Sequence, residues 1–203
     1  MLTRHDPEVK RMSHTWPAAL AVALAAMWCT GCPQMAIVTG ATTAAGAIAD
    51  DRSLDQQAAD LDVKVGIEQA LVSNAPALAS AVNVDVYLGR VMLTGVVGTW
   101  SARRYAEALA RQAAGDHEIY NDIEVATGSG FADSATNFAI NKDLGLRLIG
   151  AEGLASQSFQ HRVVNGTAFI MGQVTDPSQI VTARQVALQT RGVQNVVTHI
   201  VVR

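Results

Sequence analysis

The residues best suited to chemistry are two cysteines and five histidines. Cys29 and Cys32 enclose Thr30-Gly31, the spacing of a redox-active or metal-binding Cys-x-x-Cys pair. One such pair supplies only half of a tetrahedral metal site. It also ends an apolar run, Ala18–Trp28, with no fold around it. A redox or metal role is therefore the less favoured interpretation of the two cysteines.

No other set of residues has the spacing of a catalytic or metal site. His117, His161 and His199 lie in or near predicted strands without a second ligand at metal spacing, so we expect surface or edge histidines. Gly128-Ser129-Gly130 predicts a flexible link, because no P-loop lysine follows it. No Ser/His/Asp or Cys/His set can be assembled. The sequence therefore predicts a protein without enzymatic activity, cofactor or metal.

The first fifty residues indicate the compartment. Basic residues occur before position 12, and Met12–Ala49 then contains no Asp, Glu, Lys or Arg. A basic start, a short apolar run and small residues before a break form the layout of a secretory signal. Thr30-Gly31-Cys32 resembles the bacterial lipoprotein signal, in which the cysteine becomes lipidated. Cys29 departs from that pattern, since the family normally has Leu there.

The signal resemblance implies that residues 1–31 are a signal peptide and that residues 32–57 are a lipidated N-terminus, carrying palmitate at Cys32, and a tether. Pro33 follows Cys32, where lipoproteins kept in the inner membrane typically have Asp. The resemblance thus implies a lipid anchor on the periplasmic side of the outer membrane. The alternative is a retained membrane-spanning helix within residues 15–49. Glycines and a proline interrupt that segment, and its apolar part is shorter than the ~20 residues a span needs.

Composition limits the remaining possibilities. The 203 residues suffice for one ordinary domain or two small ones. Fifteen Lys and Arg against 18 Asp and Glu give a net charge of −3, which disfavours a nucleic-acid binder. The hydrophobic fraction of 49% with only 5% aromatic residues indicates Ala-packed elements rather than a disordered chain.

The rest of the chain contains one unit twice, at an offset of 77 residues. Glycines mark the repeat: Gly89, Gly95 and Gly115 correspond to Gly166, Gly172 and Gly192. Apolar positions match without insertion over about seventy residues, and two copies are too few for a solenoid. The sequence predicts two tandem domains, residues 58–127 and 134–203, joined by a linker at 128–133.

Each copy predicts the same order of elements, αββαβ. Helices at 63–74 and 140–151 come first, from apolar residues at i, i+4 and i+8. Hairpins follow, 82–87 with 90–97 and 160–164 with 167–174. Asn165-Gly166 predicts a type I′ turn, and Leu88-Gly89 takes the same place in the first copy.

A second helix and a last strand complete each copy. Thr99 is expected to cap the first of these helices, and Asp176 the second, with Pro177 at the first helical position. The helices are expected to stop at Gly115 and Gly192. The strands are 119–125 and 196–202. Two helices would then cover one face of a three-stranded sheet.

This order, the strand ends Leu-Thr-Gly-Val-Val and Met-Gly-Gln-Val, and the two glycine helix stops resemble the BON domain. Two such domains behind a lipoprotein signal, with Asp51-Arg52-Ser53 before the first, resemble the dual-BON lipoproteins of Gram-negative outer membranes. The resemblance implies an α+β fold with a mixed sheet. It also implies a role in cell-envelope integrity, phospholipid binding and recruitment to the division site.

Charge divides unevenly between the copies. Residues 60–126 hold nine acids and five bases, net −4, whereas residues 134–203 hold three acids and six bases, net +3. Anionic lipid attracts basic segments by about 1 kcal/mol for each well-placed Lys or Arg. The second domain is therefore the predicted membrane-facing one, with phosphatidylglycerol and cardiolipin as its expected ligands.

The first helix of the second domain carries the candidate site. Ile140, Leu144 and Leu148 form its predicted core stripe, and an apolar outer stripe with a lysine is what an interfacial helix needs. The resemblance implies lipid binding by an aromatic residue four positions before a lysine. Phe138 and Lys142 match, with Phe in place of the family's Trp. The predicted phospholipid-binding residues are Phe138, Lys142, Leu146, Arg147 and Ile149.

An alternative remains open for this outer stripe. It could pack against the first domain or the linker, because Leu61, Val65 and Val72 occupy the equivalent face of the first copy. The protein would then be an adaptor for an envelope assembly, such as the outer-membrane β-barrel insertion machinery. Exposure of Phe138, Leu146 and Ile149 would favour lipid, and burial between the domains would favour the adaptor.

Overall fold

The computed structural model describes residues 52–126, 134–154 and 159–203. Residues 47–203 form one compact unit. Cys32 and the predicted signal peptide lie outside the described residues, so the lipidation of Cys32 and the signal peptide stay predictions. Among the helices of the described ranges, none is long and apolar enough to span a membrane.

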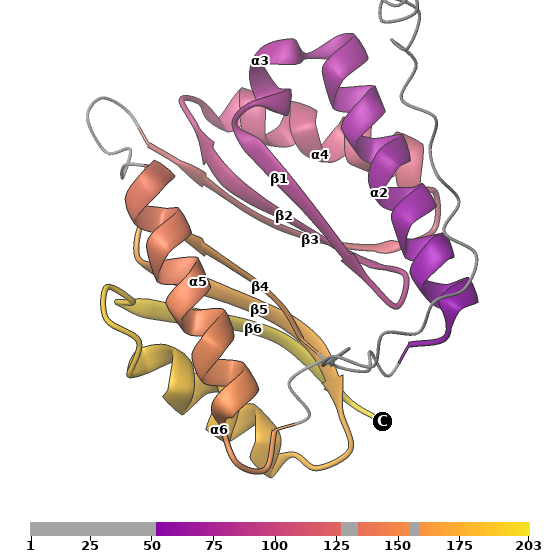
Figure 1. The fold of residues 1–203 in the computed structure, drawn as a ribbon. Coiled ribbons are helices and arrows are strands. Elements are labelled where there is room, and N and C mark those ends of the chain that lie inside the picture. Colours follow the sequence, from indigo (N-terminus) through magenta and orange to yellow (C-terminus); the bar gives the residue numbers. More distant parts are fainter. Residues whose placement is uncertain (1–51, 127–133, 155–158) are drawn as a thin grey trace, which may run out of the picture. The chain divides into compact units, whose positions relative to one another are not determined.

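The first copy folds as α2 (Leu54–Asn74), α3 (Pro76–Ala79), β1 (Val82–Tyr87), β2 (Arg90–Val97), α4 (Trp100–Ala114) and β3 (Glu118–Val125). Its sheet has the order β1-β2-β3, antiparallel between the first two strands and parallel between the last two. The helices α2 and α4 cover one face of this sheet (Figure 1). The four-residue α3 was not predicted from the sequence.

The second copy repeats this arrangement as α5 (Ser134–Gly150), β4 (Phe159–Val164), β5 (Thr167–Val174), α6 (Ser178–Leu188) and β6 (Asn195–Val202). The sheet order is β4-β5-β6 with the same strand directions. The predicted αββαβ order and mixed sheets are confirmed.

Both hairpin turns adopt the predicted left-handed backbone. Leu88 and Gly89 have φ values of 51° and 71°, and Asn165 and Gly166 have 46° and 76°. A positive φ suits Asn and Gly but is unfavourable for Leu. The first turn therefore needs stabilising contacts from outside the hairpin.

Asp60 on α2 provides these contacts. Its two carboxylate oxygens accept hydrogen bonds from the backbone N–H groups of Leu88 and Gly89, both at 2.8 Å. Arg52 donates to the same carboxylate at 2.7 Å. Asp60 is 5% exposed, so these charge-assisted bonds are shielded from water. They fasten the start of α2 to the far end of the β1–β2 hairpin.

The helix ends follow the sequence only in part, since α2 and α5 begin at Leu54 and Ser134, before the predicted residues 63 and 140. Thr99 Oγ1 caps α4 by accepting from the Ala102 N–H at 3.1 Å, and α4 ends at Gly115, where φ is 62°. The predicted cap of α6 is shifted by one residue: Pro177 is the N-cap and Ser178 the first helical residue, although Asp176 accepts from the Ser178 N–H at 2.8 Å. The predicted stop at Gly192 is wrong, because α6 ends at Leu188.

The early end of α6 has a local cause. The Thr190 N–H bonds to the Ala187 carbonyl and the Val193 N–H to the Thr190 carbonyl, both at 3.0 Å. These i to i−3 bonds tighten the chain into turns. Gly192 is still favoured, since its φ is 95° and a Cβ there would lie 2.6 Å from the end of the Ile140 side chain.

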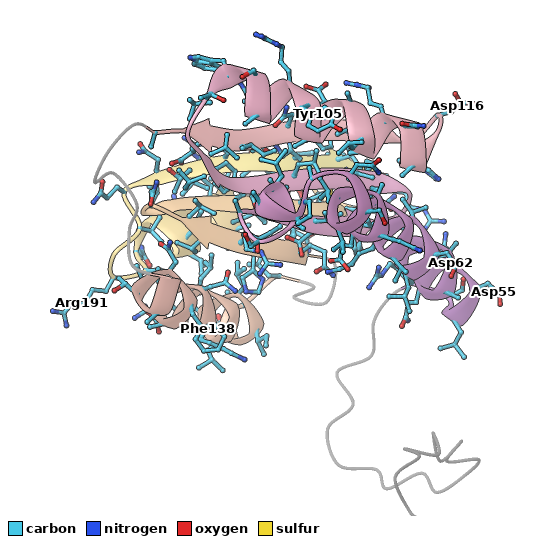
Figure 2. The ribbon with its side chains drawn as sticks, turned by 90° about the horizontal axis from the view of Figure 1, so that it is seen from above. Asp55, Asp62, Tyr105, Asp116, Phe138 and Arg191 are labelled. Atoms are coloured by element: carbon cyan, nitrogen blue, oxygen red, sulfur yellow. The ribbon has the colours of Figure 1, made fainter. Side chains whose placement is uncertain are left out.

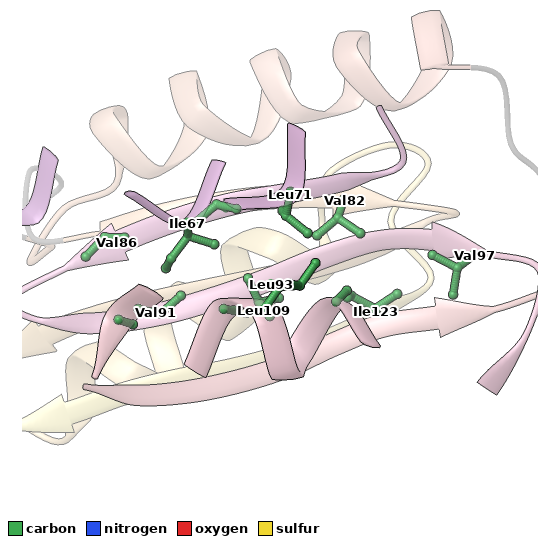
Figure 3. Packing of buried hydrophobic residues seen from close by; sticks show 13 residues of the cluster. Ile67, Leu71, Val82, Val86, Val91, Leu93, Val97, Leu109 and Ile123 are labelled. Atoms are coloured by element: carbon green, nitrogen blue, oxygen red, sulfur yellow. The ribbon is translucent and has the colours of Figure 1, made fainter. Parts of the chain in front are cut away.

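Each domain has its own core between helices and sheet. In the first, Ile67 and Leu71 of α2 pack on Val91 and Leu93 of β2, with Leu109 of α4 beside them (Figure 3). The corresponding core of the second domain is formed by Leu144, Leu148, Ile170, Ala183 and Ala187, together with their neighbours.

A third apolar cluster joins the two domains. It uses the sheet faces that carry no helices: Tyr87 and Met92 from the first sheet, and Val164, Phe169 and Met171 from the second. Alternate strand residues point to opposite faces, so each sheet packs on its helices with one set and on the other sheet with the next.

Polar contacts surround this cluster at equivalent positions. Arg162 makes a bidentate pair with Asp85, at 2.6 and 3.0 Å, and the His199 Nε2 lies 2.6 Å from the Asp122 Oδ2. Each pair joins residues 77 apart, which are the same position in the two copies. Arg90 donates across the interface to the Gly172 carbonyl at 2.8 Å.

His161 of β4 fixes the position of α5 on the second sheet. Its ring lies against Gly145, where a Cβ would come within 2.8 Å of the His161 Nε2. Burial lowers the pKa of His161 below the ordinary 6.5, and a hydrogen bond to the Asn141 backbone partly offsets this. The neutral ring is therefore the form that suits the folded domain.

We expect Asp60→Ala to lower the free energy of unfolding by about 3 kcal/mol, because the turn N–H groups lose a buried charged acceptor and Arg52 loses its carboxylate. Asp62→Ala, on the exposed side of the same helix, should cost less than about 0.5 kcal/mol. Urea denaturation of the two variants would compare them. Equal effects would contradict the role given to Asp60.

We also expect acid to weaken the second domain through His161. The folded-state pKa is lowered, so below the ordinary value of 6.5 the unfolded chain binds more protons than the folded one. Stability is then complete above that value and falls as the pH drops through it. Urea denaturation at about pH 7.5 and about pH 5.5 should show this loss, reduced in His161→Val. Valine is chosen because Val84 occupies the equivalent position of the first domain. An unchanged pH dependence in that variant would contradict the assignment.

Candidate phospholipid-binding face

The helix α5 turns one side to the core and the other to solvent. Leu144 and Leu148 are buried, and Ile140 is packed against the same core, as the sequence predicted. Gly145 is buried as well, against His161 of β4, so with 3.6 residues per turn Phe138, Leu146 and Ile149 lie on the outer side.

The outer side is apolar and uncovered. Phe138 is 63% exposed, Leu146 70% and Ile149 50%. Figure 2 shows Phe138 pointing away from the body of its domain. These side chains are therefore not buried between the domains, the arrangement that would have favoured an adaptor over a lipid-binding face.

The two predicted cations of this face differ in their surroundings. The Lys142 Nζ lies 5.4 Å from the centre of the Phe138 ring, one helical turn away. Arg147 pairs with Asp143 on the same helix, at 2.8 Å, and both side chains are largely exposed. Lys142 is thus the cation held next to the aromatic residue, whereas the charge of Arg147 is partly neutralised by its neighbour.

A hollow of about 470 Å³ opens beside Phe138. Asn137 and Asn141 of α5 and Arg162 of β4 are among the residues that line it. Arg162 is held there by Asp85, so its charge is already paired. Ser80, Asn83 and Gly95 of the first domain line it as well, so the hollow lies between the two domains.

The histidines have roles that the sequence did not indicate. His199 lies on Asp122 and stacks on Tyr120, with the ring centres 3.9 Å apart. The Nδ1 of His117 lies 2.8 Å from the Gly89 carbonyl oxygen. Only the repeat could have suggested the first of these contacts, because His199 and Asp122 are equivalent positions. Within the described ranges, no three His, Cys, Asp or Glu side chains are grouped to hold a metal ion.

Comparison with known proteins identifies relatives over most of the chain. The outer membrane lipoprotein DolP of Haemophilus influenzae is 28% identical over 180 residues, which cover 88% of this chain and 92% of that protein. A 21 kDa hemolysin of Actinobacillus pleuropneumoniae is 30% identical over 149 residues, covering 73% and 76% of the two chains.

Solved structures give a weaker likeness. The C-terminal domain of CdsD, from the type III secretion system of Chlamydia trachomatis, matches at 17% identity with a TM-score of 0.29. The match covers 71% of this chain and 67% of that one. At this level it supports no structural or functional argument.

The BON domain profile matches residues 59–127 and 137–203, which contain the two αββαβ copies. The repeat found in the sequence, the mixed three-stranded sheets and this double match agree on one assignment. The chain belongs to the BON domain family and contains two BON domains.

Proposed function

We propose that this protein is a lipid-anchored lipoprotein on the periplasmic side of the outer membrane, and that its second BON domain binds anionic phospholipid. The anchor is proposed at Cys32, on the motif Thr30-Gly31-Cys32. The similarity to DolP, named an outer membrane lipoprotein, over 88% of the chain supports this location. The proposed role is binding without catalysis, in support of cell-envelope integrity, with recruitment to the division site through the lipids bound.

The observation that carries the proposal is the exposed outer face of α5. Phe138, Leu146 and Ile149 would each have to stay hydrated in a free protein, and a lipid surface would bury them. Partial insertion of an aromatic and two aliphatic side chains suits a helix that lies in the membrane interface.

Charge favours the same face. Lys142 lies beside Phe138, where it would meet the phosphate groups of phosphatidylglycerol or cardiolipin as the ring enters the interface. Each well-placed base adds about 1 kcal/mol of attraction to an anionic surface. Arg162, counted among the six bases of the second domain, is paired with Asp85 and would not contribute.

The prediction concerns vesicle binding by residues 47–203. We expect co-sedimentation with phosphatidylglycerol or cardiolipin vesicles at about 0.15 M salt, and none with phosphatidylcholine. Phe138→Ala should weaken binding about tenfold through lost apolar burial, and Lys142→Glu by about thirtyfold through reversal of one charge.

Leu61→Ala provides the matched control, since Leu61 is the residue of α2 equivalent to Phe138 and is 58% exposed. This variant should bind vesicles as the wild type does. If the wild type fails to bind anionic vesicles, or if the two α5 variants bind normally, the phospholipid proposal is wrong. The N-terminal lipid would then be the proposed membrane contact.

A further inference from the structure

The helix α2 carries a line of exposed apolar residues that is separate from its buried face. We name this line the α2 seam; it consists of Leu54, Ala58, Leu61, Val65, Glu68 and Val72. Its large apolar members are 82% (Leu54), 58% (Leu61), 49% (Val65) and 59% (Val72) exposed. The buried residues of α2, Asp60, Ile67 and Leu71, lie on a different side of the helix.

The spacing within the α2 seam is that of a helix-docking surface. Its positions alternate by four and three residues through the whole 21-residue helix, about 31 Å in length. This average of 3.5 residues keeps side chains in one line toward a partner helix, as in coiled coils. Single exposed apolar residues are ordinary on a protein surface, but four along one line are not scattered.

A hollow of about 420 Å³ lies beside the first half of this line. Leu54, Ala58 and Leu61 of the seam line it, together with Val86 of β1 and Gln160 of β4. Its charged lining residues are Arg52 with its partner Asp60, Lys64, and Asp85. A side chain from a helix docked on the α2 seam could therefore enter the surface rather than lie on a flat face.

Charge selects the kind of partner. Asp55 and Asp62 flank the α2 seam, and Figure 2 shows both at the surface of the helix. Glu68 belongs to the α2 seam and forms an ion pair with Lys64, whose Nζ lies 3.7 Å from the Glu68 Oε1. An anionic membrane would be repelled by the carboxylates of Asp55 and Asp62, whereas the charge of Glu68 is partly neutralised by Lys64. A second copy of α2 would bring like charges together, Glu68 on Glu68 when parallel and the Asp-bearing flanks when antiparallel.

We infer that the α2 seam docks an amphipathic helix of a partner protein, with apolar residues at heptad spacing and Lys or Arg beside them. This inference does not depend on phospholipid binding by α5. The two equivalent helix faces would serve different ligands. Their charges differ at several positions: Val65 of α2 corresponds to Lys142 of α5, and Asp62 and Glu68 correspond to Ala139 and Gly145.

The test uses synthetic helical peptides of three heptads and residues 47–203, with fluorescence anisotropy as the measurement. The basic peptide carries Leu at the two seam positions of each heptad and Lys at the flanking positions. A second peptide has Glu in place of Lys, and a third has the basic composition in scrambled order. The basic heptad peptide should bind at least about tenfold more tightly than either of the others.

Three variants locate the binding site. Val65→Lys, which introduces the residue type of the second copy, and Leu61→Asp should each weaken binding of the basic peptide at least about tenfold. Asp62→Lys should weaken it through charge alone. All three side chains are exposed, so the variants are expected to fold, which circular dichroism would check. Phe138→Ala should bind the peptide normally.

Several results would overturn the inference. Equal binding of the scrambled peptide would mean attraction by charge without a seam, and absence of binding to the basic peptide would mean that no helix docks. Normal binding by Val65→Lys would place the peptide elsewhere. A dimer in sedimentation that Leu61→Asp abolishes would make a second copy the occupant. Vesicle binding is measured separately with Phe138→Ala, so failure of the helix-docking inference can be distinguished from failure of the phospholipid proposal.

Discussion

The contact between equivalent positions of the two sheets is the constraint on which the rest of this structure depends. Asp85 meets Arg162, and Asp122 meets His199, in each case a residue and its counterpart 77 positions later. Equivalent residues can meet only near an axis that exchanges the two copies, as in the interface of a symmetric dimer. Identical residues at such points would bring two acids or two bases together. A carboxylate facing a guanidinium or an imidazole at these positions therefore requires the two copies to differ.

This packing determines which surfaces remain for binding. The helix-free faces of both sheets are used by the cluster around Met92 and Phe169. The outer faces of the helices are left to solvent, and the first helix of each copy carries an apolar line there. Binding in this protein is thus expected on helix faces. Part of the charge difference between the domains belongs to the interface, where Arg162 of the second domain pairs with Asp85 of the first. Another part faces outward, as Lys142 does beside Phe138.

Local structure could be predicted from the sequence because short-range signals fix it. The Asn165-Gly166 turn, the Thr99 cap and the alternation of the strands depend on residues close in the chain. The end of α6 was mispredicted because Gly192 is favoured by contact with Ile140, in another helix, and not as a helix stop. The part played by Asp60 was equally out of reach, since its partners lie 28 and 29 residues away.

The outer face of α5 could be predicted from the sequence, but its surroundings could not. Helical spacing placed Phe138, Leu146 and Ile149 on one outer face, and their exposure agrees with that placement. Spacing alone gave no means to separate this face from the equivalent one on α2, because both are apolar. The separation comes from charge: Lys142 lies beside an aromatic ring, whereas Val65 lies among carboxylates. Charge differs at more than this position, since Asp62 and Glu68 of α2 correspond to Ala139 and Gly145 of α5, and together these changes would direct two similar apolar faces toward ligands of opposite charge.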